Sequence, residues 1–196
     1  MTYKRPYREV MPVAQHLLEK LAPFCHDIMI AGSLRRQREV IGDIEIVALP
    51  RRQPDLFGGD SDHSDQPTWL DMFLAEKLPG SAWIKNGRKY KQFMYGRYQV
   101  DLFLPESAAH WGCISLIRTG SHEFNLWLMG EAQRAAGVQF KDGRLWRGGE
   151  VLATPDEESV FEALGLPYIL PNFRDDKDWL NLLEKKNVDL RTIKQN

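Results

Sequence analysis

Apolar side chains recur at helical intervals near the start of the chain, at Val13, Leu17, Leu18 and Leu21. This spacing predicts a helix over residues 9–21 that rests on a core. Short runs of apolar or alternating residues then predict strands, at residues 28–31, 44–49, 82–84, 89–95 and 98–104. The first half of the chain therefore combines helical and strand patterns.

A second helix is predicted at residues 69–78, and Gly96-Arg97 is typical of a tight turn between two strands of a hairpin. Residues 51–66 are rich in Gly, Asp, Ser and Pro, which indicates a solvated loop. This loop contains several aspartates, but it lacks the ligand order of an EF-hand calcium site.

Capping and turn signals organise the second half. Ser121 predicts the N-cap of a helix that ends near Ala136. Asp142-Gly143 predicts a hairpin turn. The segment Thr154-Pro155-Asp156-Glu157 predicts a capping box with proline at the first helical position.

These elements predict an α/β (α+β) fold with two subdomains around one cleft. Residues 1–105 form the first subdomain, a mixed β-sheet with flanking helices. Residues 106–175 form a small C-terminal α+β subdomain, and residues 176–196 form a helical tail.

The composition is typical of a globular protein, since 43% of the 196 residues are hydrophobic and 27% are charged. The formal net charge of -1 gives no general attraction to nucleic acid, so any DNA contact must come from local patches. Two cysteines exclude a disulfide scaffold. No apolar run approaches the ~20 residues of a membrane span, and no secretory pattern follows the start. We expect an intracellular monomer, cytoplasmic or nucleoid-associated, that is neither secreted nor membrane-bound.

Three carboxylates carry the candidate chemistry. Asp43 and Glu45 are two positions apart, so on a strand both side chains point to the same face. Asp101 lies within another predicted strand, where aspartate is disfavoured; on an edge strand it would simply be a solvated acid. If the two strands are neighbours, the three like charges require cations. Two Mg²⁺ ions, or Mn²⁺, would suit such a site.

The segment Gly32-Ser33-Leu34-Arg35-Arg36 precedes these acids. Its small residues allow backbone N–H groups and the Ser33 hydroxyl to approach phosphate oxygens. Either arginine can bind phosphate through two parallel hydrogen bonds. The turn and the acids together indicate nucleotidyl transfer.

Gly-Ser-x-Arg-Arg followed by Gly-Asp-x-Glu resembles the nucleotidyltransferase signature of family X, the polymerase beta-like DNA polymerases. Further matches follow in the family's order. Residues 100–103 resemble the strand of the third catalytic acid, and residues 111–125 contain the Thr-Gly-Ser…Phe-Asn nucleotide-binding segment. Residues 149–151 and 161–174 resemble the C-terminal subdomain of the family. The resemblance implies a nucleotidyltransferase palm in the first subdomain.

The resemblance also implies a role for each matched residue. Asp43, Glu45 and Asp101 would bind two Mg²⁺ ions, and Asp101 would help to deprotonate the primer 3′-hydroxyl. The phosphates of the incoming dNTP would contact Gly32, Ser33, Arg36 and Gly42. Its sugar and base would lie along Ile117, Arg118, Thr119, Gly120 and Asn125.

The sequence departs from the family pattern at several positions. Glu45 replaces the usual aspartate, and Ile117-Arg118 replaces an aromatic pair that packs against the sugar. Gln99 replaces an arginine near the primer phosphate. The chain resembles a minimal form without the N-terminal helix-hairpin-helix and lyase domain, so no lyase activity is expected.

The candidate DNA contacts are Lys89, Lys91 and Gln99, beside the strand of Asp101. A basic cluster alone is usually a solvated face, but beside a metal cleft it can also be a phosphate track. The expected partners are dNTP and a gapped or primed DNA duplex, with gap filling in DNA repair as the function. Two alternatives stay open: a nucleotidyltransferase with an RNA, protein or small-molecule acceptor, and a weakly catalytic DNA-end-binding module.

Overall fold

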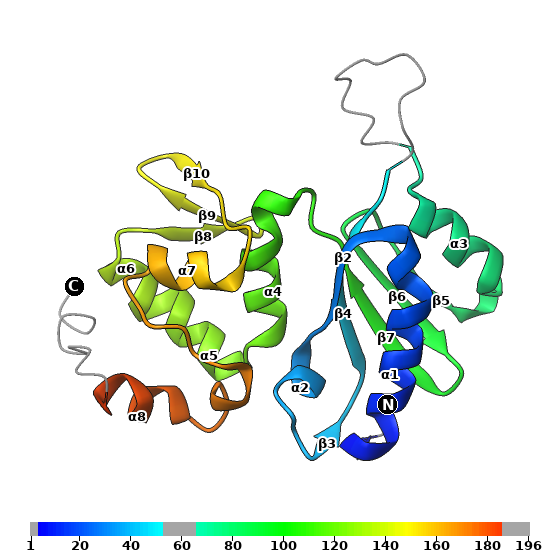
Figure 1. Ribbon diagram of the computed structural model, residues 1–196, viewed down its shortest axis with the longest axis horizontal. Coiled ribbons are helices and arrows are strands. Elements are labelled where there is room, and N and C mark those ends of the chain that lie inside the picture. Colours follow the sequence, from blue (N-terminus) through cyan, green and yellow to red (C-terminus); the bar gives the residue numbers. More distant parts are fainter. Residues whose placement is uncertain (1–3, 53–65, 186–196) are drawn as a thin grey trace.

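The computed structural model describes residues 4–52 and 66–185, so most of the predicted loop and the end of the predicted tail lie outside the described residues. Residues 4–52 and 66–105, which we call the N-terminal subdomain, lie beside residues 106–185, which we call the C-terminal subdomain (Figure 1). Each contains its own cluster of buried apolar side chains. Helices and strands are mixed in both, which confirms the α+β prediction.

The N-terminal subdomain is built on a five-stranded sheet. Across the sheet, the strands are β2 (Cys25–Ile30), β4 (Ile44–Pro50), β7 (Tyr98–Phe103), β6 (Tyr90–Tyr95) and β5 (Trp83–Asn86). Strands β4 and β7 are parallel, and the other neighbours are antiparallel. Strand β7 is therefore central, and Tyr95 pairs with Tyr98 across the predicted turn. The short strands β1 (Arg5–Pro6) and β3 (Val40–Ile41) pair separately.

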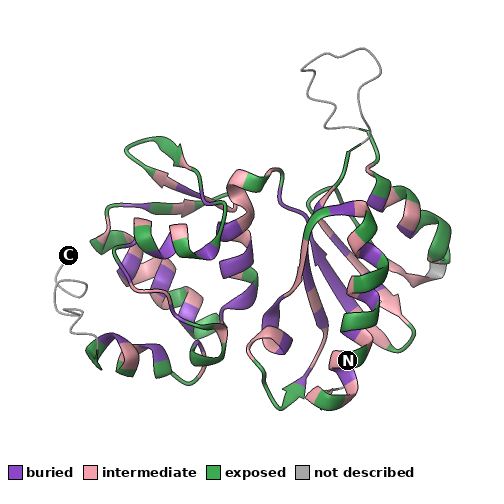
Figure 2. Cartoon of the chain, in the orientation of Figure 1, coloured by how far each residue is buried: buried purple, intermediate pink, exposed green. Residues whose placement is uncertain are grey.

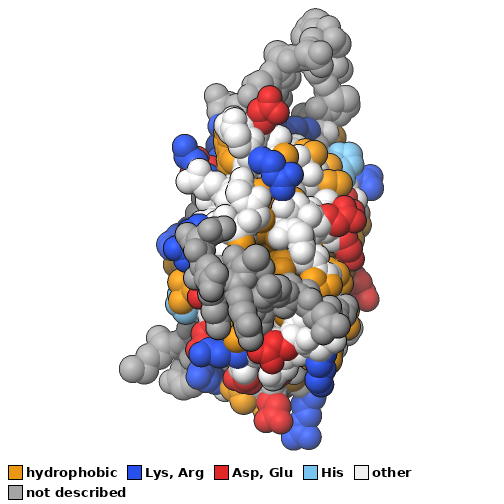
Figure 3. Space-filling model, turned by 90° about the vertical axis from the view of Figure 1, so that its left-hand side faces the viewer, with side chains coloured by type: hydrophobic (Ala, Val, Ile, Leu, Met, Phe, Trp, Pro, Cys, Tyr) orange, Lys and Arg blue, Asp and Glu red, His pale blue; other side chains and the backbone are white. Residues whose placement is uncertain are grey.

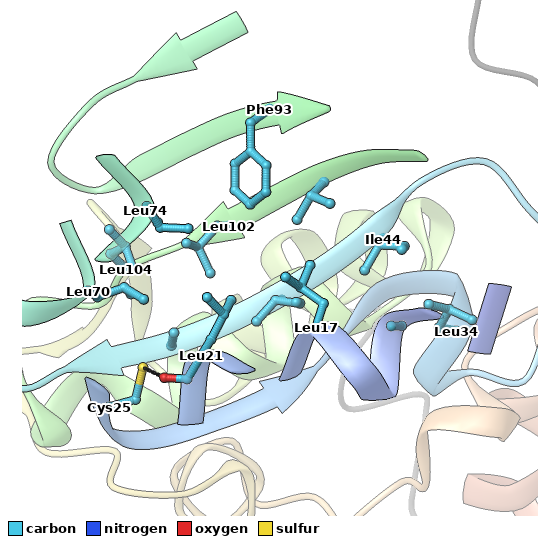
Figure 4. Packing of buried hydrophobic residues seen from close by; sticks show 14 of the residues in the cluster. Leu17, Leu21, Cys25, Leu34, Ile44, Leu70, Leu74, Phe93, Leu102 and Leu104 are labelled. Carbon is cyan, nitrogen blue, oxygen red and sulfur yellow. Dashed lines mark hydrogen bonds between the residues drawn. The ribbon is translucent and has the colours of Figure 1, made fainter. Parts of the chain in front are cut away.

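Helix α1 (Tyr7–Leu21) covers one face of this sheet. Its buried residues are Val10, Ala14, Leu17 and Leu21, so the prediction is confirmed for the two leucines. The predicted Val13 and Leu18 are only half-buried. Figure 4 shows Leu17 and Leu21 among apolar side chains of the sheet and of α3 (Trp69–Lys77). The remaining elements of this subdomain are η1 (Ala22–Phe24), α2 (Gly32–Arg35) and η2 (Gly80–Ala82).

The C-terminal subdomain combines a group of helices with a small sheet at its side (Figure 1). It begins with η3 (Ala108–His110) and α4 (Trp111–Thr119), whose buried residues continue the purple interior in Figure 2. Then follow α5 (His122–Trp127), the π-helical turn η4 (Leu128–Ala132) and α6 (Gln133–Ala135). The antiparallel sheet contains β8 (Gln139–Lys141), β9 (Arg144–Arg147) and β10 (Glu150–Leu152). The last elements are α7 (Glu157–Ala163), η5 (Pro171–Phe173) and α8 (Asp178–Lys185).

The predicted N-cap at Ser121 is confirmed, because its hydroxyl accepts the N–H of Phe124 at 3.1 Å. The helical segment continues through the π-helical turn and ends before Gly137, whose φ is 63°. The predicted hairpin at Asp142-Gly143 is also confirmed, with positive φ at both residues. Two positive φ values are typical of a tight hairpin turn.

The predicted capping box at Thr154 is wrong. Asp156 is the N-cap of α7, and its partner in the capping box is Ser159. Thr154 is buried, and its N–H and hydroxyl both approach the carbonyl of Ala109. Thr154 therefore makes a tertiary contact and does not cap α7, so this helix starts later than predicted.

Both cysteines are buried and free, one in each apolar cluster. Burial raises the pKa of the Cys25 thiol to about 12 and has the same effect on Cys113. Across residues 4–52 and 66–185, every helix is too short or too polar to cross a lipid bilayer.

Helix α4 approaches the start of α7 so closely that Gly112 has no room for a side chain. A Cβ atom there would lie 1.8 Å from the carbonyl oxygen of Asp156. The N–H of Gly112 also donates to the carbonyl of Thr154 at 2.7 Å. At Gly130, in contrast, an added Cβ atom would meet no atom within 4 Å.

We expect Gly112→Ala to lower the free energy of unfolding by about 2–3 kcal/mol, because backbone must move to admit the methyl group. Gly130→Ala is the matched control, and we expect it to be neutral or to stabilise the protein by up to about 1 kcal/mol. Urea unfolding followed by tryptophan fluorescence measures both changes. Equal effects of the two substitutions would contradict the close packing at Gly112.

Candidate active site

Strand pairing brings the predicted acids together. The parallel register of β4 and β7 places Glu45 directly beside Asp101. Asp43 precedes β4 by one residue, which corrects the expectation that both acids of the pair lie on one strand. By strand alternation, Glu45 and Asp101 share the sheet face on which α4 packs.

Asp101 is a buried acid on the central strand, with a relative exposure of 8%. The reading of Asp101 as a solvated edge acid is therefore wrong. Its Oδ1 accepts hydrogen bonds from the Tyr90 hydroxyl and the Gln92 amide, each at 2.8 Å. The amide of Gln99 lies 3.4 Å from Oδ2. These donors hold the carboxylate in one orientation.

Glu45 packs against Gly32, at the start of α2. Gly32 has a φ of 59°, and a Cβ atom there would lie 1.6 Å from Oε2 of Glu45. Both the backbone conformation and the contact therefore require glycine. Burial and the charge of Asp43 raise the pKa of Glu45 to about 7, although Arg36 opposes this rise.

The charge at this site is consistent with a cation-binding function. Burial raises the pKa of Asp43, and the charge of Asp101 and a side-chain hydrogen bond to it raise it further. Carboxylate oxygens are the ligands that Mg²⁺ and Mn²⁺ prefer, so the donor set fits these ions chemically. Among residues 4–52 and 66–185, no three His, Cys, Asp or Glu side chains are already grouped as one metal site. The carboxylate of Glu45 instead contacts Gly32.

The two arginines of the predicted phosphate turn contact the C-terminal subdomain. Nε of Arg36 lies 3.0 Å from Oδ2 of Asp175, and its Nη1 donates to the carbonyl of Thr119 at 2.6 Å. Nη1 of Arg35 donates to the Thr119 hydroxyl at 2.7 Å and pairs with Glu157. These bonds join the subdomains, and the phosphate role of Arg36 stays a prediction.

Glu157 is the central acid of this interface, with a side-chain exposure of 4%. Besides Arg35, it accepts hydrogen bonds from Nη2 of Arg174 at 2.8 Å and from the Tyr168 hydroxyl at 3.1 Å. Arg174 is itself fully buried. Burial alone would raise the pKa of Glu157, but the charges and hydrogen bonds of Arg174 and Arg35 lower it.

The predicted nucleotide segment spans the end of α4 and the start of α5. The guanidinium carbon of Arg118 lies 4.1 Å from the ring centroid of Phe103. The amide of Asn125 donates to the carbonyl of Ile117 at 2.7 Å, while its Oδ1 has no hydrogen-bond partner in the described part of the chain. A Cβ atom at Gly120 would lie 2.6 Å from this oxygen. The segment is therefore closely packed, with Arg118 at its exposed edge.

Lys91, a predicted DNA contact, has a structural role. It is buried, and its ammonium group bonds to Asp71 at 2.7 Å, Asn86 at 2.7 Å and the carbonyl of Gly87 at 3.2 Å. An ammonium group has three N–H donors. A phosphate could therefore bind Lys91 only if one of these bonds were broken.

The remaining predicted contacts are more accessible. Lys89 is exposed and pairs with Glu106 at 2.7 Å. Ser33 and Gly42 are half-buried, and an added Cβ at Gly42 would meet nothing within 4 Å.

A groove of about 530 Å³ lies between the two subdomains, lined by side chains that include Tyr90, Phe103, Ile114, Arg118, Arg144 and Trp146. At the far end of the C-terminal subdomain, basic and acidic side chains are interspersed (Figure 3).

Sequence comparison then adds an independent finding about the C-terminal subdomain. Residues 115–175 match the family model of the DNA polymerase beta thumb. The match supports a relation between this chain and the polymerase beta-like DNA polymerases. A search of curated proteins finds no match. The thumb match begins within α4 and includes Glu157, Arg174 and Asp175, so it covers the C-terminal side of the interface.

Several residues of the site were not predicted. The turn at Gly96-Arg97 fixes the register of β6 and β7, so it could have identified Gln92 as the residue opposite Asp101. No local signal identifies Glu157 or Asp175 as partners of the two arginines. They come from distant parts of the chain and meet the turn only in the folded protein.

We expect Glu157→Gln to lower the free energy of unfolding by about 3 kcal/mol at neutral pH, because it leaves two guanidinium groups beside a neutral amide. The contribution of Glu157 is present above its unfolded pKa, near 4.5, and is lost as pH falls through the lower folded value. The wild type should therefore lose stability more steeply than the variant below pH ~4.5.

Glu158→Gln is the control for this prediction, because Glu158 is the adjacent exposed acid in the first turn of α7. We expect that change to cost less than about 0.5 kcal/mol. Urea unfolding at a series of pH values measures all three proteins. Parallel pH profiles for the wild type and Glu157→Gln would contradict the assignment.

Proposed function

We propose that this chain is a polymerase beta-like DNA polymerase that transfers a dNMP from dNTP to a DNA 3′-hydroxyl, with gap filling in DNA repair as its role. The observation that best supports this proposal is the pairing of β4 with β7, which brings Glu45 beside Asp101. Asp43, one residue before β4, adds a third carboxyl whose pKa is raised by burial and by the charge of Asp101. The thumb match supports DNA as the substrate.

Asp101 is the acid best suited to act on the attacking hydroxyl. Its Oδ1 accepts two short hydrogen bonds, from Tyr90 and Gln92, and Oδ2 lies 3.4 Å from the Gln99 amide. A carboxylate oriented in this way can accept or direct the hydroxyl proton with little reorganisation. Asp43 and Glu45 would complete the ligand set. When bound, two Mg²⁺ ions would neutralise the phosphates and lower the pKa of the hydroxyl.

The nucleotide would lie between the acids and the thumb. Ser33, Arg36 and the backbone at Gly42 would bind its phosphates, and the open space beside Gly42 supports this assignment. The sugar would lie along residues 117–120. Arg118 extends over Phe103 at the groove, and it would offer a positive charge where the family has an aromatic residue.

A gap-filling assay tests the proposal with a gapped duplex, a labelled dNTP and Mg²⁺ or Mn²⁺. We expect templated incorporation that stops on metal chelation. Asp101→Asn should lower its rate by at least about 100-fold, because the oriented carboxylate is lost. Asp27→Asn is the matched control, since Asp27 is an exposed acid on β2 of the same sheet and should leave the rate unchanged.

The outcome separates the alternatives. Incorporation on DNA without regard to the template would indicate a terminal transferase. Transfer to RNA, protein or a small molecule alone would indicate a different acceptor. Tight binding of gapped DNA without any transfer would indicate a DNA-end-binding module, and the polymerase proposal would then be wrong.

A further inference from the structure

Arg36 is held by the C-terminal subdomain through two of the three nitrogens of its guanidinium group. Nε lies 3.1 Å and 3.0 Å from the two carboxylate oxygens of Asp175. Nη1 donates to the carbonyls of Thr119 at 2.6 Å and Gly120 at 3.1 Å. These bonds use Nε and Nη1 completely, because together the two atoms carry three N–H groups.

The two carbonyls are suitable acceptors because they end a helix. Gly120 is the C-cap of α4, and Thr119 is its last residue. The last carbonyls of a helix have no partner within the helix, so a nearby guanidinium group both satisfies them and offsets the helix dipole. The contact with Arg36 therefore stabilises α4 and also fixes the direction of the arginine.

Asp175 is held in place by its neighbour. Nε of Arg174 donates to the carbonyl of Ile169 at 2.9 Å, and Nη2 binds Glu157 at 2.8 Å. Arg174 is fully buried, so the backbone leading into Asp175 has little freedom. The Asp175 side chain is itself only 13% exposed. Its carboxylate is thus a fixed anchor and not a mobile surface acid.

The second terminal nitrogen of Arg36, Nη2, has no hydrogen-bond partner among the described residues of the protein. It carries two N–H donors. The backbone N–H of Arg36 donates to the carbonyl of Gly32 at 3.1 Å, and Gly32 packs against the carboxylate of Glu45, so Arg36 lies close to the acid site. Two nitrogens of Arg36 are therefore bound to the C-terminal subdomain, and the donors of Nη2 remain for an anion beside the acids.

We propose that Asp175 is a positioning residue for the nucleotide: it holds Arg36 so that Nη2 faces the triphosphate. The inference rests on the proposed function. If Asp175 has this role, the affinity for phosphate depends on the contact between the two subdomains, because Asp175, Thr119 and Gly120 all belong to the C-terminal subdomain. A nucleotide bound to Arg36 would in turn favour the docked arrangement, since coupling between two sites is reciprocal.

An alternative role for Asp175 predicts the opposite change in the affinity for phosphate. If Asp175 only neutralised Arg36, removing its charge would strengthen phosphate binding. If it positions Arg36, removing its charge weakens binding, although the site becomes more positive. The direction of the change therefore distinguishes orientation from simple electrostatics.

The test compares Asp175→Asn with Asp176→Asn. Asp176 is the adjacent acid, is 77% exposed and pairs with Arg38, so its substitution makes the same change in net charge. We expect Asp175→Asn to raise the KM for dNTP in gap filling, and its Kd in fluorescence titration with Mg²⁺, by about tenfold, within the usual range of coupling between sites. The kcat should change little. Asp176→Asn should match the wild type, and Asp175→Glu should recover part of the loss.

A double substitution tests the route through Arg36. The Arg36→Lys substitution leaves a single nitrogen, so Asp175 has no separate terminal nitrogen to orient toward the phosphate. Adding Asp175→Asn in that background should therefore have no further effect on KM. Tighter nucleotide binding by Asp175→Asn, or binding equal to that of Asp176→Asn, would overturn the inference alone. If the wild type neither bound nor incorporated dNTP, the proposed function would also be wrong.

Discussion

The shared carboxylate of Glu157 is the contact on which the arrangement of the two subdomains depends. It receives Arg174 from its own subdomain and Arg35 from the other, in a setting that water hardly reaches. A buried charge is tolerated only when such partners compensate it. Arg35 belongs to the short helix that begins at Gly32, next to Glu45. The contact that joins the two subdomains therefore also fixes the backbone beside the acids.

A second constraint acts within the sheet, where carboxyls of like charge are gathered in a poorly solvated space. The raised pKa values of Asp43 and Glu45 report the cost of that arrangement. Asp101 is compensated differently, by neutral donors from Tyr90 and Gln92. The protein therefore orients Asp101 through hydrogen bonds, whereas burial and neighbouring like charges disfavour ionisation of Asp43 and Glu45.

Much of the fold was predictable because its signals are local. Helical spacing identified α1, and strand patterns with a two-residue turn identified β6 and β7. The predictions failed at residues that bond to distant groups. Thr154 bonds to the carbonyl of Ala109 and does not cap a helix, and Lys91 is buried against Asp71. The acids could be predicted as a group, but the contact of Arg36 with Asp175 joins residues 139 positions apart. No local pattern encodes such a pair.

The two buried cysteines make the joint between the subdomains accessible to spectroscopy. Cys25 belongs to one core and Cys113 to the other, and neither thiol is exposed to reagents in the folded state. Thiolate is the form that reacts with thiol-directed probes, and burial suppresses it. A pair of surface cysteines, one on each subdomain, could therefore carry a donor dye and an acceptor dye without removal of the native thiols. A change in the distance between the two halves would then appear directly as a change in energy transfer.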